Sequence, residues 1–153
     1  NFVRERENNP FLIDFELLAD RAKKVRQYSS KIEFVLSQGK EEFCKNPMYF
    51  DRARYFYFVV FDSLFDICKH MANRLGVKKL NHDCFSSLIE IGVLPKELLE
   101  VTSKMLNLKD KLSSSWEIKQ EELYSSLSEL LPHFEEVLKS HSHGLKKALI
   151  IQK

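Results

Sequence analysis

Apolar side chains recur at alternating spacings of four and three residues over two long segments, and this pattern constrains the fold more than any other feature. The first series begins at Phe11 and ends at Leu36, with Ser29 as its one polar member. This spacing is typical of an amphipathic α-helix with one apolar face. The second segment, residues 51–75, is the most apolar in the chain. A helix that is apolar over most of its circumference is expected at the centre of a domain.

The later segments continue the helical pattern with breaks at turn-forming residues. A short helix is expected over residues 81–91, ended by Gly92, and Pro95 fits the first turn of the next helix. Three serines at 113–115 weaken the pattern, and the periodicity resumes over 123–137 despite a proline within that range. We therefore expect a helical break between residues 109 and 116.

These segments predict an all-α fold, an antiparallel up-and-down bundle of about four long helices plus one short helix. Glycine and proline, four of each in 153 residues, are too few for a turn-dense β fold. The length suits one domain over residues 1–153, and no stretch is a linker that would divide it. Residues 140–153 are interpreted as a C-terminal extension, because they end in an apolar stub with basic flanks.

Charge and cysteine content narrow the class of protein. The 24 basic and 22 acidic residues are well mixed and give a formal charge of +2, which suits neither an indiscriminate polycation nor a disordered acidic tail. The chain has three cysteines, Cys44, Cys68 and Cys84. A small, odd number of cysteines does not suit a disulfide framework, so we expect the protein to reside in a reducing cytoplasm. No apolar run approaches the roughly 20 residues that cross a bilayer. The charged amino end is unlike a signal peptide. Because the sequence begins with Asn, its first residues are given no weight in this interpretation.

The twelve phenylalanines allow two interpretations, a base-stacking platform or a packed core. Their positions favour the core or a dimer interface, since four lie in the second segment and most of the others lie on or near neighbouring apolar seams. The first group is Phe56, Phe58, Phe61 and Phe65, and the second is Phe11, Phe15, Phe34, Phe85 and Phe134.

Several kinds of chemistry are excluded by spacing. Cys68 and His70 diverge on a helix, and His82 and Cys84 lack the second pair that a zinc site needs. The glycines form no phosphate-binding loop, and no serine lies on a nucleophile elbow. We expect neither a metal nor a cofactor.

Two stretches remain as candidates for function. Asp66 and His70 stand four residues apart on one helical face, which fits an ordinary acidic–imidazole pair as well as a functional site. Residues 105–116 end a helix in a serine-rich stretch, which fits a solvated break as well as a site. Local sequence leaves both alternatives open.

Taken in order, these stretches resemble the HEPN superfamily, in particular the HepT-like toxins that accompany minimal nucleotidyltransferases. The resemblance covers about residues 50–138. It consists of an apolar helix that begins near Arg54 and contains Asp-Ile-x-x-His at 66–70, then Phe-x-x-Leu-x-x-x-Gly-Val-Leu at 85–94, then Met-x-x-Leu at 105–108.

The resemblance implies a catalytic motif, Arg-x4-His-x-Tyr, near the dimer interface of an all-helical bundle and used for metal-independent RNA cleavage. The aligned residues here are Lys109, Ser114 and Trp116, so all three motif positions depart from the pattern. Lysine lacks the planar fork of arginine, and serine cannot accept a proton near neutral pH. Loss of a general acid/base costs on the order of 10²–10⁴ in rate. Tryptophan also lacks the hydroxyl that a partner nucleotidyltransferase can adenylylate in this family.

The leading hypothesis is therefore a homodimeric HepT-like protein of a toxin–antitoxin type system that works with a minimal nucleotidyltransferase. It would bind RNA or nucleotide weakly, with its ribonuclease activity weakened or lost. Arg54, Lys104 and Lys111, together with Lys109, are the candidate RNA-binding residues. One alternative is an active ribonuclease in which His70 or His82 replaces the missing imidazole, with Asp66 beside His70. Another is a helical interaction protein without a nucleic-acid role.

Overall fold

The computed structural model describes residues 11–77, 83–114 and 118–151, and within them it contains α-helices and short 3-10 helices but no strand. The prediction of an all-α bundle is confirmed. The helices are, in chain order, α1 Phe15–Leu36, α2 Lys40–Lys45, α3 Pro47–Arg74, α4 Cys84–Glu90, η2 Lys96–Leu98, α5 Leu99–Ser114, α6 Gln120–Leu130, η3 Leu131–His133 and α7 Phe134–Ile151.

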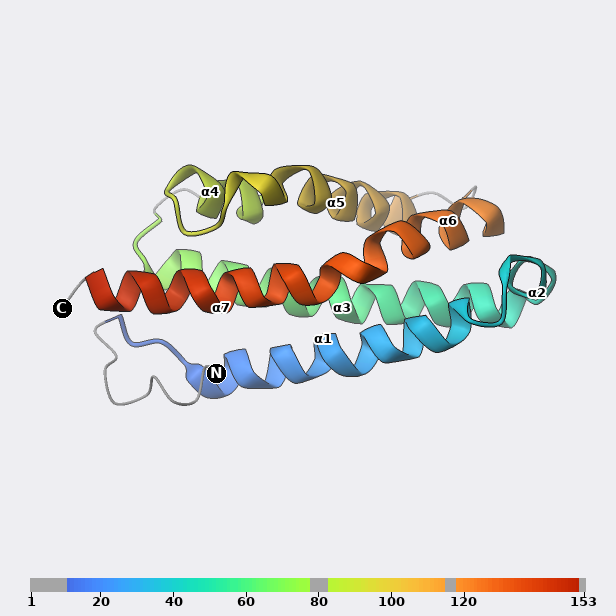
Figure 1. Cartoon of the computed structure of the whole chain (residues 1–153), viewed down its shortest axis with the longest axis horizontal. Coiled ribbons are helices and arrows are strands. Elements are labelled where there is room, and N and C mark those ends of the chain that lie inside the picture. The colour runs from blue at the N-terminus through green and yellow to red at the C-terminus, as the bar shows by residue number, and fades with distance from the viewer. Residues whose placement is uncertain (1–10, 78–82, 115–117, 152–153) are drawn as a thin grey trace.

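Helices α1, α3 and α5 run antiparallel in turn, and α6 with α7 forms the fourth leg of the bundle (Figure 1). This leg bends at η3, where Pro132 lacks the N–H that a continuous α-helix would use and the turn tightens to 3-10 geometry. Helix α2 lies at one end of the bundle, and α4 lies near the other end, where α7 finishes (Figure 1). No helix in the described part of the chain is both long enough and apolar enough to span a membrane.

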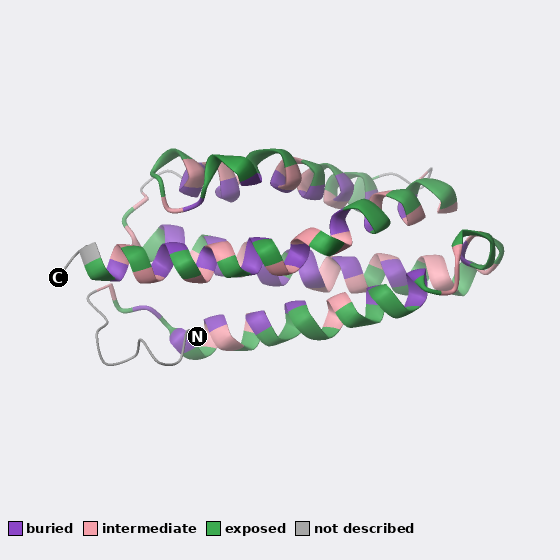
Figure 2. Ribbon diagram, in the orientation of Figure 1, coloured by how far each residue is buried: buried purple, intermediate pink, exposed green. Residues whose placement is uncertain are grey.

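Helix α1 begins and ends where its residues require. The Asp14 side chain accepts a hydrogen bond from the Leu17 N–H at 3.0 Å, and Gly39, at φ +91°, follows the helix in a conformation that side chains rarely adopt. Its buried face is the predicted seam, but Phe34 is an exception, being 66% exposed. It was expected on or near that seam. The neighbouring Ile32, Val35 and Leu36 occupy the buried face instead, as the alternation of buried and exposed turns shows (Figure 2).

Helix α3 is central, as predicted, and packs against each of the other six α-helices. Asn46 caps it by accepting from the Met48 N–H at 3.0 Å, and Pro47 occupies the first turn. Its buried Tyr57 hydroxyl donates to the Met105 carbonyl oxygen of α5 at 2.5 Å. This bond ties the middle of α3 to α5, which carries the candidate motif.

The last helix includes most of the residues interpreted as a C-terminal extension. Residues 140–151, interpreted as an extension, continue α7, and Leu145 and Leu149 are buried in the core. Gly144 allows a close approach here, because a Cβ at this position would overlap the Val93 carbonyl oxygen in the turn after α4. The C-terminal part of α7 is therefore a packed element of the bundle.

Candidate functional site

Two of the candidate cations meet on the ring of Phe58, where α3 faces α5. The Arg54 guanidinium carbon lies 4.7 Å from the ring centroid, and the Lys109 ammonium nitrogen lies 5.4 Å from it. Lys109 is also 5.2 Å from the Phe61 centroid. All three distances suit cation–π contacts, which hold the charges of Arg54 and Lys109 beside each other at the surface.

Both cations also have polar partners. The Nε and Nη2 groups of Arg54 donate to the Leu112 carbonyl oxygen, at 3.3 and 2.9 Å, in the last turn of α5. The last carbonyls of an α-helix generally lack partners within the helix, and a cation at this end also suits the helix dipole. The Lys109 ammonium donates to Asp62 at 3.3 Å, and its side chain is 27% exposed. Arg54, Phe58 and Asp62 thus form one stripe of α3 at i, i+4 and i+8.

The second motif position is occupied by a hydroxyl that serves its own helix. Ser114 Oγ donates to the Asp110 carbonyl oxygen at 2.7 Å, and Ser113 Oγ donates in the same way to Lys109 at 2.8 Å. Helix α5 continues through Ser114, five residues beyond the start of the expected break. Trp116, the third motif position, lies outside the described residues.

The other two lysines lie on a different side of α5. At about 100° per residue, Lys104 and Lys111 nearly superpose along the helix, whereas Lys109 is turned about 140° from Lys104. Lys104 forms an ion pair with Glu129 and is 3.3 Å from Glu100, and these hydrogen bonds raise the pKa of Lys104. Lys111 donates to Glu122 at 2.8 Å. The three lysines therefore form no single patch, and carboxylates from this chain balance each of them.

Asp66 and His70 share a face of α3, but each binds a different residue and they form no pair with each other. Asp66 accepts from Arg21 of α1 at 2.9 Å, and His70 Nε2 accepts from the Asp14 N–H at 3.0 Å. Burial and the nearby Arg74 lower the pKa of His70. At 1.5 Å per residue, His70 lies about 24 Å along α3 from Arg54. Both residues join α3 to α1, away from the Lys109 cluster.

The remaining described histidines also lie apart from Lys109 and Ser114. His133 contacts Glu136 at 3.2 Å within its own turn, His141 is buried, and His143 lies on the surface of α7. His82 lies outside the described residues. Among the described residues, no three His, Cys, Asp or Glu side chains are placed to hold a metal ion.

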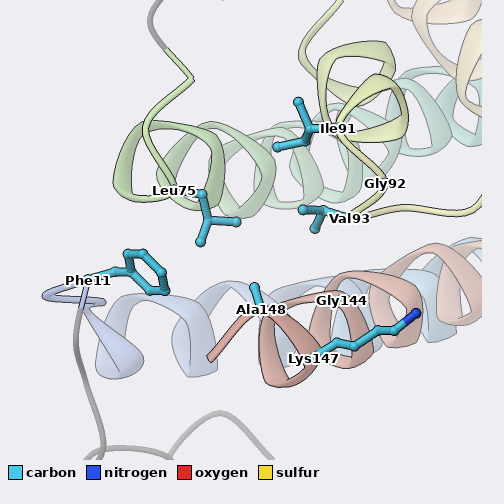
Figure 3. Close-up of a pocket in the computed structure, with 8 residues that line it drawn as sticks. All are labelled: Phe11, Leu75, Ile91, Gly92, Val93, Gly144, Lys147 and Ala148. Atoms are coloured by element: carbon cyan, nitrogen blue, oxygen red, sulfur yellow. The ribbon is translucent and has the colours of Figure 1, made fainter. Parts of the chain in front are cut away.

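A pocket of about 290 Å³ lies away from the cation cluster, between the ends of α3 and α7 and the turn after α4 (Figure 3). It is mainly apolar, with Phe11, Leu75 and Val93 facing one another across it. Its lining contains one charged side chain, Lys147, and no group able to move a proton near neutral pH. The pocket therefore offers no chemistry to the motif.

A sequence model of the family described as Ribonuclease HepT-like matches residues 25–141. The chain belongs to the HepT-like ribonuclease family. The match extends the resemblance of residues 50–138 back into α1 and three residues further along α7, so every leg of the bundle contributes to it. Neither the curated proteins nor the solved structures compared with this HepT-like chain gave a match.

The candidates Arg54 and Lys109 lie together with two residues that the sequence did not single out, Phe58 as the shared ring and Asp62 as the counter-charge. A signal for both exists, since residues 54, 58 and 62 repeat every four positions and so share one helical face. What the sequence could not supply was the rotation of α5 that brings Lys109 to this face.

Proposed function

We propose that this HepT-like protein binds RNA weakly, with its metal-independent ribonuclease activity attenuated or lost, and that it acts in a complex with a minimal nucleotidyltransferase. One observation carries the proposal: the motif position that needs an imidazole holds Ser114, whose hydroxyl is directed to its own helix. No histidine of the described chain lies beside Lys109 to replace it. Without a group that titrates near neutral pH, proton transfer at this site is slow.

The residual function assigned to the site is phosphate binding by Arg54 and Lys109. Arg54 supplies the planar fork that lysine at 109 lacks, and only two of its five N–H donors serve Leu112. The ion pair of Lys109 with Asp62 is partly exposed, and such pairs contribute little stability, so a phosphate can replace the carboxylate at small cost. The exposed ring of Tyr55, one turn from Phe58, adds a surface on which a base can stack.

Restoring the motif tests the loss of activity. Purified protein is incubated with structured RNA in the presence of a chelator, as wild type and as Lys109→Arg/Ser114→His. We expect no cleavage by the wild type and measurable cleavage by the double variant, because the variant regains the fork and the imidazole. Lys109→Arg/Ser114→Ala, which adds no imidazole, is the matched control.

RNA binding is tested separately by retention of the protein on RNA at low ionic strength. We expect Arg54→Ala to weaken retention several-fold and Arg52→Ala to leave it nearly unchanged, since Arg52 is an exposed residue of α3 outside the cluster. If the wild type is not retained at all, the result supports the alternative of a helical interaction protein without a nucleic-acid role. One observation already favours that alternative: Lys104, Lys109 and Lys111 each form an ion pair with a carboxylate of the same chain.

The competing hypothesis of an active ribonuclease predicts metal-independent cleavage by the wild type that His70→Ala or His82→Ala abolishes and Ser114→Ala does not. His70 is poorly suited to the role, because its Nε2 already accepts the Asp14 N–H. That cleavage result would contradict attenuation while leaving the family assignment intact.

Two partners are part of the proposal. Homodimerisation is proposed through α3 beside the cation cluster, where Val59 and Phe65 are only half-buried, so that the exposed ring of Tyr55 is left to RNA. Light scattering at micromolar concentration should give about twice the chain mass of 18.1 kDa, and a monomer mass would contradict it. For the nucleotidyltransferase, the test is whether a neighbouring reading frame encodes one and whether the two products copurify.

A further inference from the structure

Three aromatic rings pack together where α3 faces α1. Tyr28 of α1 lies edge-on to Tyr55 and Phe56 of α3, at centroid distances of 6.1 and 5.7 Å. The Tyr55 and Phe56 rings are 6.1 Å apart and tilted by 58°. These distances suit attractive aromatic pairs. Tyr28 and Phe56 are half-buried, whereas Tyr55 is 56% exposed, so the two inner rings support an outer ring that meets the solvent.

A cation of α1 lies over the two inner rings. The Lys31 ammonium nitrogen is 5.7 Å from the Tyr28 centroid and 5.8 Å from the Phe56 centroid, which suits cation–π contacts. Lys31 is exposed, and among the described residues no carboxylate pairs with it, in contrast to the three lysines of α5. An anionic ligand can therefore bind Lys31 without displacing a carboxylate.

Three successive residues of α3 connect these rings with the cation cluster. At about 100° per residue, Arg54, Tyr55 and Phe56 point in three different directions. Arg54 reaches the Leu112 carbonyl oxygen of α5, Tyr55 points to solvent, and Phe56 contacts Tyr28 of α1. The outer ring therefore lies between the α5 side and the α1 side of the helix.

Cations thus flank Tyr55 on both sides. Figure 1 shows α3 between α5 and α1, and α3 contacts both of these helices. Arg54 and Lys109 lie on the α5 side, and Lys31 lies on the α1 side. A helix with its side chains is about 10–12 Å across, so the two groups of cations are separated by roughly that distance. A strand of a few nucleotides is long enough to bridge it.

We propose that an unpaired RNA strand crosses α3 from Arg54 and Lys109 to Lys31 and stacks a base on Tyr55. The proposal rests on the RNA binding proposed above, and it names single-stranded segments as the RNA that this surface recognises. Bases inside a duplex are stacked on one another, whereas an unpaired base can place its face on an aromatic side chain. Lys31 becomes a second phosphate contact, outside the motif.

The test is fluorescence anisotropy at low ionic strength with three labelled ligands of equal length. They are a single-stranded RNA, the same strand annealed to its complement, and a ribose-phosphate strand without bases. Stacking of one base on an aromatic ring raises affinity roughly 5- to 150-fold. We therefore expect the wild type to bind the single strand at least about 5-fold more tightly than the base-free strand, although both carry the same phosphates.

Substitutions separate the ring from the charge. Tyr55→Ala should weaken binding of the single strand by about the same factor and leave the base-free strand unchanged, whereas Tyr55→Phe, which keeps the ring, should bind like the wild type. Lys31→Ala should weaken both strands several-fold and to the same extent. Lys23→Ala is its matched control, because Lys23 is exposed on α1 but is turned about 80° away from Lys31. Circular dichroism checks that each variant is folded.

Three outcomes would overturn the proposal in different ways. Equal wild-type affinity for the single strand and the base-free strand would remove stacking and leave phosphate binding at Arg54 and Lys109 intact. Absence of binding to all three ligands would contradict the RNA binding itself. A Tyr55→Ala protein that binds the single strand like the wild type but has half its mass in light scattering would assign this ring to a dimer contact.

Discussion

Acidification should destabilise this protein through one buried histidine. His141 of α7 is completely buried, with its ring edge-on to Phe85 at a centroid distance of 5.8 Å. Its Nδ1–H donates to the Val137 carbonyl oxygen at 2.8 Å, and its Nε2 has no hydrogen-bond partner. A proton added to Nε2 would place an unpaired charge in the core, and this burial lowers the pKa of His141 to about 4.

The lowered pKa sets both the size and the direction of the effect. In the unfolded chain the ring takes up a proton near pH 6.5, whereas in the folded protein it stays neutral until about pH 4. Between these values the unfolded state binds more protons, so stability rises with pH and is lost as the pH falls. A difference of about 2.5 pKa units corresponds to roughly 3 kcal/mol, lost progressively from pH 6.5 to pH 4.

The assay is urea unfolding followed by circular dichroism at pH 7, 6, 5 and 4. Wild type is compared with His141→Leu, which fills the site with an apolar side chain of similar size. Any constant packing effect of leucine cancels, because only the change of unfolding free energy with pH is compared. The same comparison cancels acid effects from carboxylates and from His70. His143→Gln, a change at an exposed position of the same helix, should follow the wild type.

The expected result is a wild-type free energy that falls by about 3 kcal/mol more than that of His141→Leu between pH 7 and pH 4. Equal pH slopes in the two proteins would refute the reasoning. They would mean that the His141 ring gains a proton in the folded state as easily as in the unfolded chain.

Two further substitutions test packing around α5 and α7. Gly144→Ala should lower the free energy of unfolding by about 2–4 kcal/mol in chemical denaturation, because the clash of the new Cβ with the Val93 backbone outweighs the better helix propensity of alanine. Ser142→Ala on the same helix is the control and should change this free energy by under about 1 kcal/mol. An unchanged free energy for Gly144→Ala would show that the turn after α4 moves easily to make room. Tyr57→Phe should cost about 1 kcal/mol through loss of the buried bond to Met105, measured as a lower melting temperature, and an unchanged value would mean that this bond adds no net stability.

The helical fold was predictable because apolar spacing dictates which faces are buried. The buried face of α1 follows directly from it. In α3, by contrast, only Phe61 of the four phenylalanines is buried, and Tyr57, Val60 and Leu64 share the buried face with it. Helix α2 was not predicted, because a six-residue helix with one buried side chain, Phe43, is too short to show a period. Phe34 was misplaced because composition favours burial of a phenylalanine, whereas the helix turns that position towards solvent.

The candidate site was predictable only in part. The four-residue repeat of Arg54, Phe58 and Asp62 is visible in the sequence, and rotation around α5 alone separates Lys109 from Lys104. The carboxylates that pair with the lysines come from other helices, so their positions depend on packing across the bundle. The Arg21 and Asp14 contacts that divide Asp66 from His70 are tertiary for the same reason.

The ion pairs of α5 change what a salt titration of RNA binding will report. A lysine free in solution attracts counterions to itself, and its contact with phosphate releases cations from the RNA, which makes affinity fall steeply with salt. Lys104, Lys109 and Lys111 are already neutralised by Glu129, Asp62 and Glu122, so each phosphate contact must also free one of these carboxylates. Added salt weakens the lysine–carboxylate pair that is broken as well as the lysine–phosphate contact that is made. Binding through these lysines should therefore vary with the logarithm of salt concentration less steeply than their number suggests.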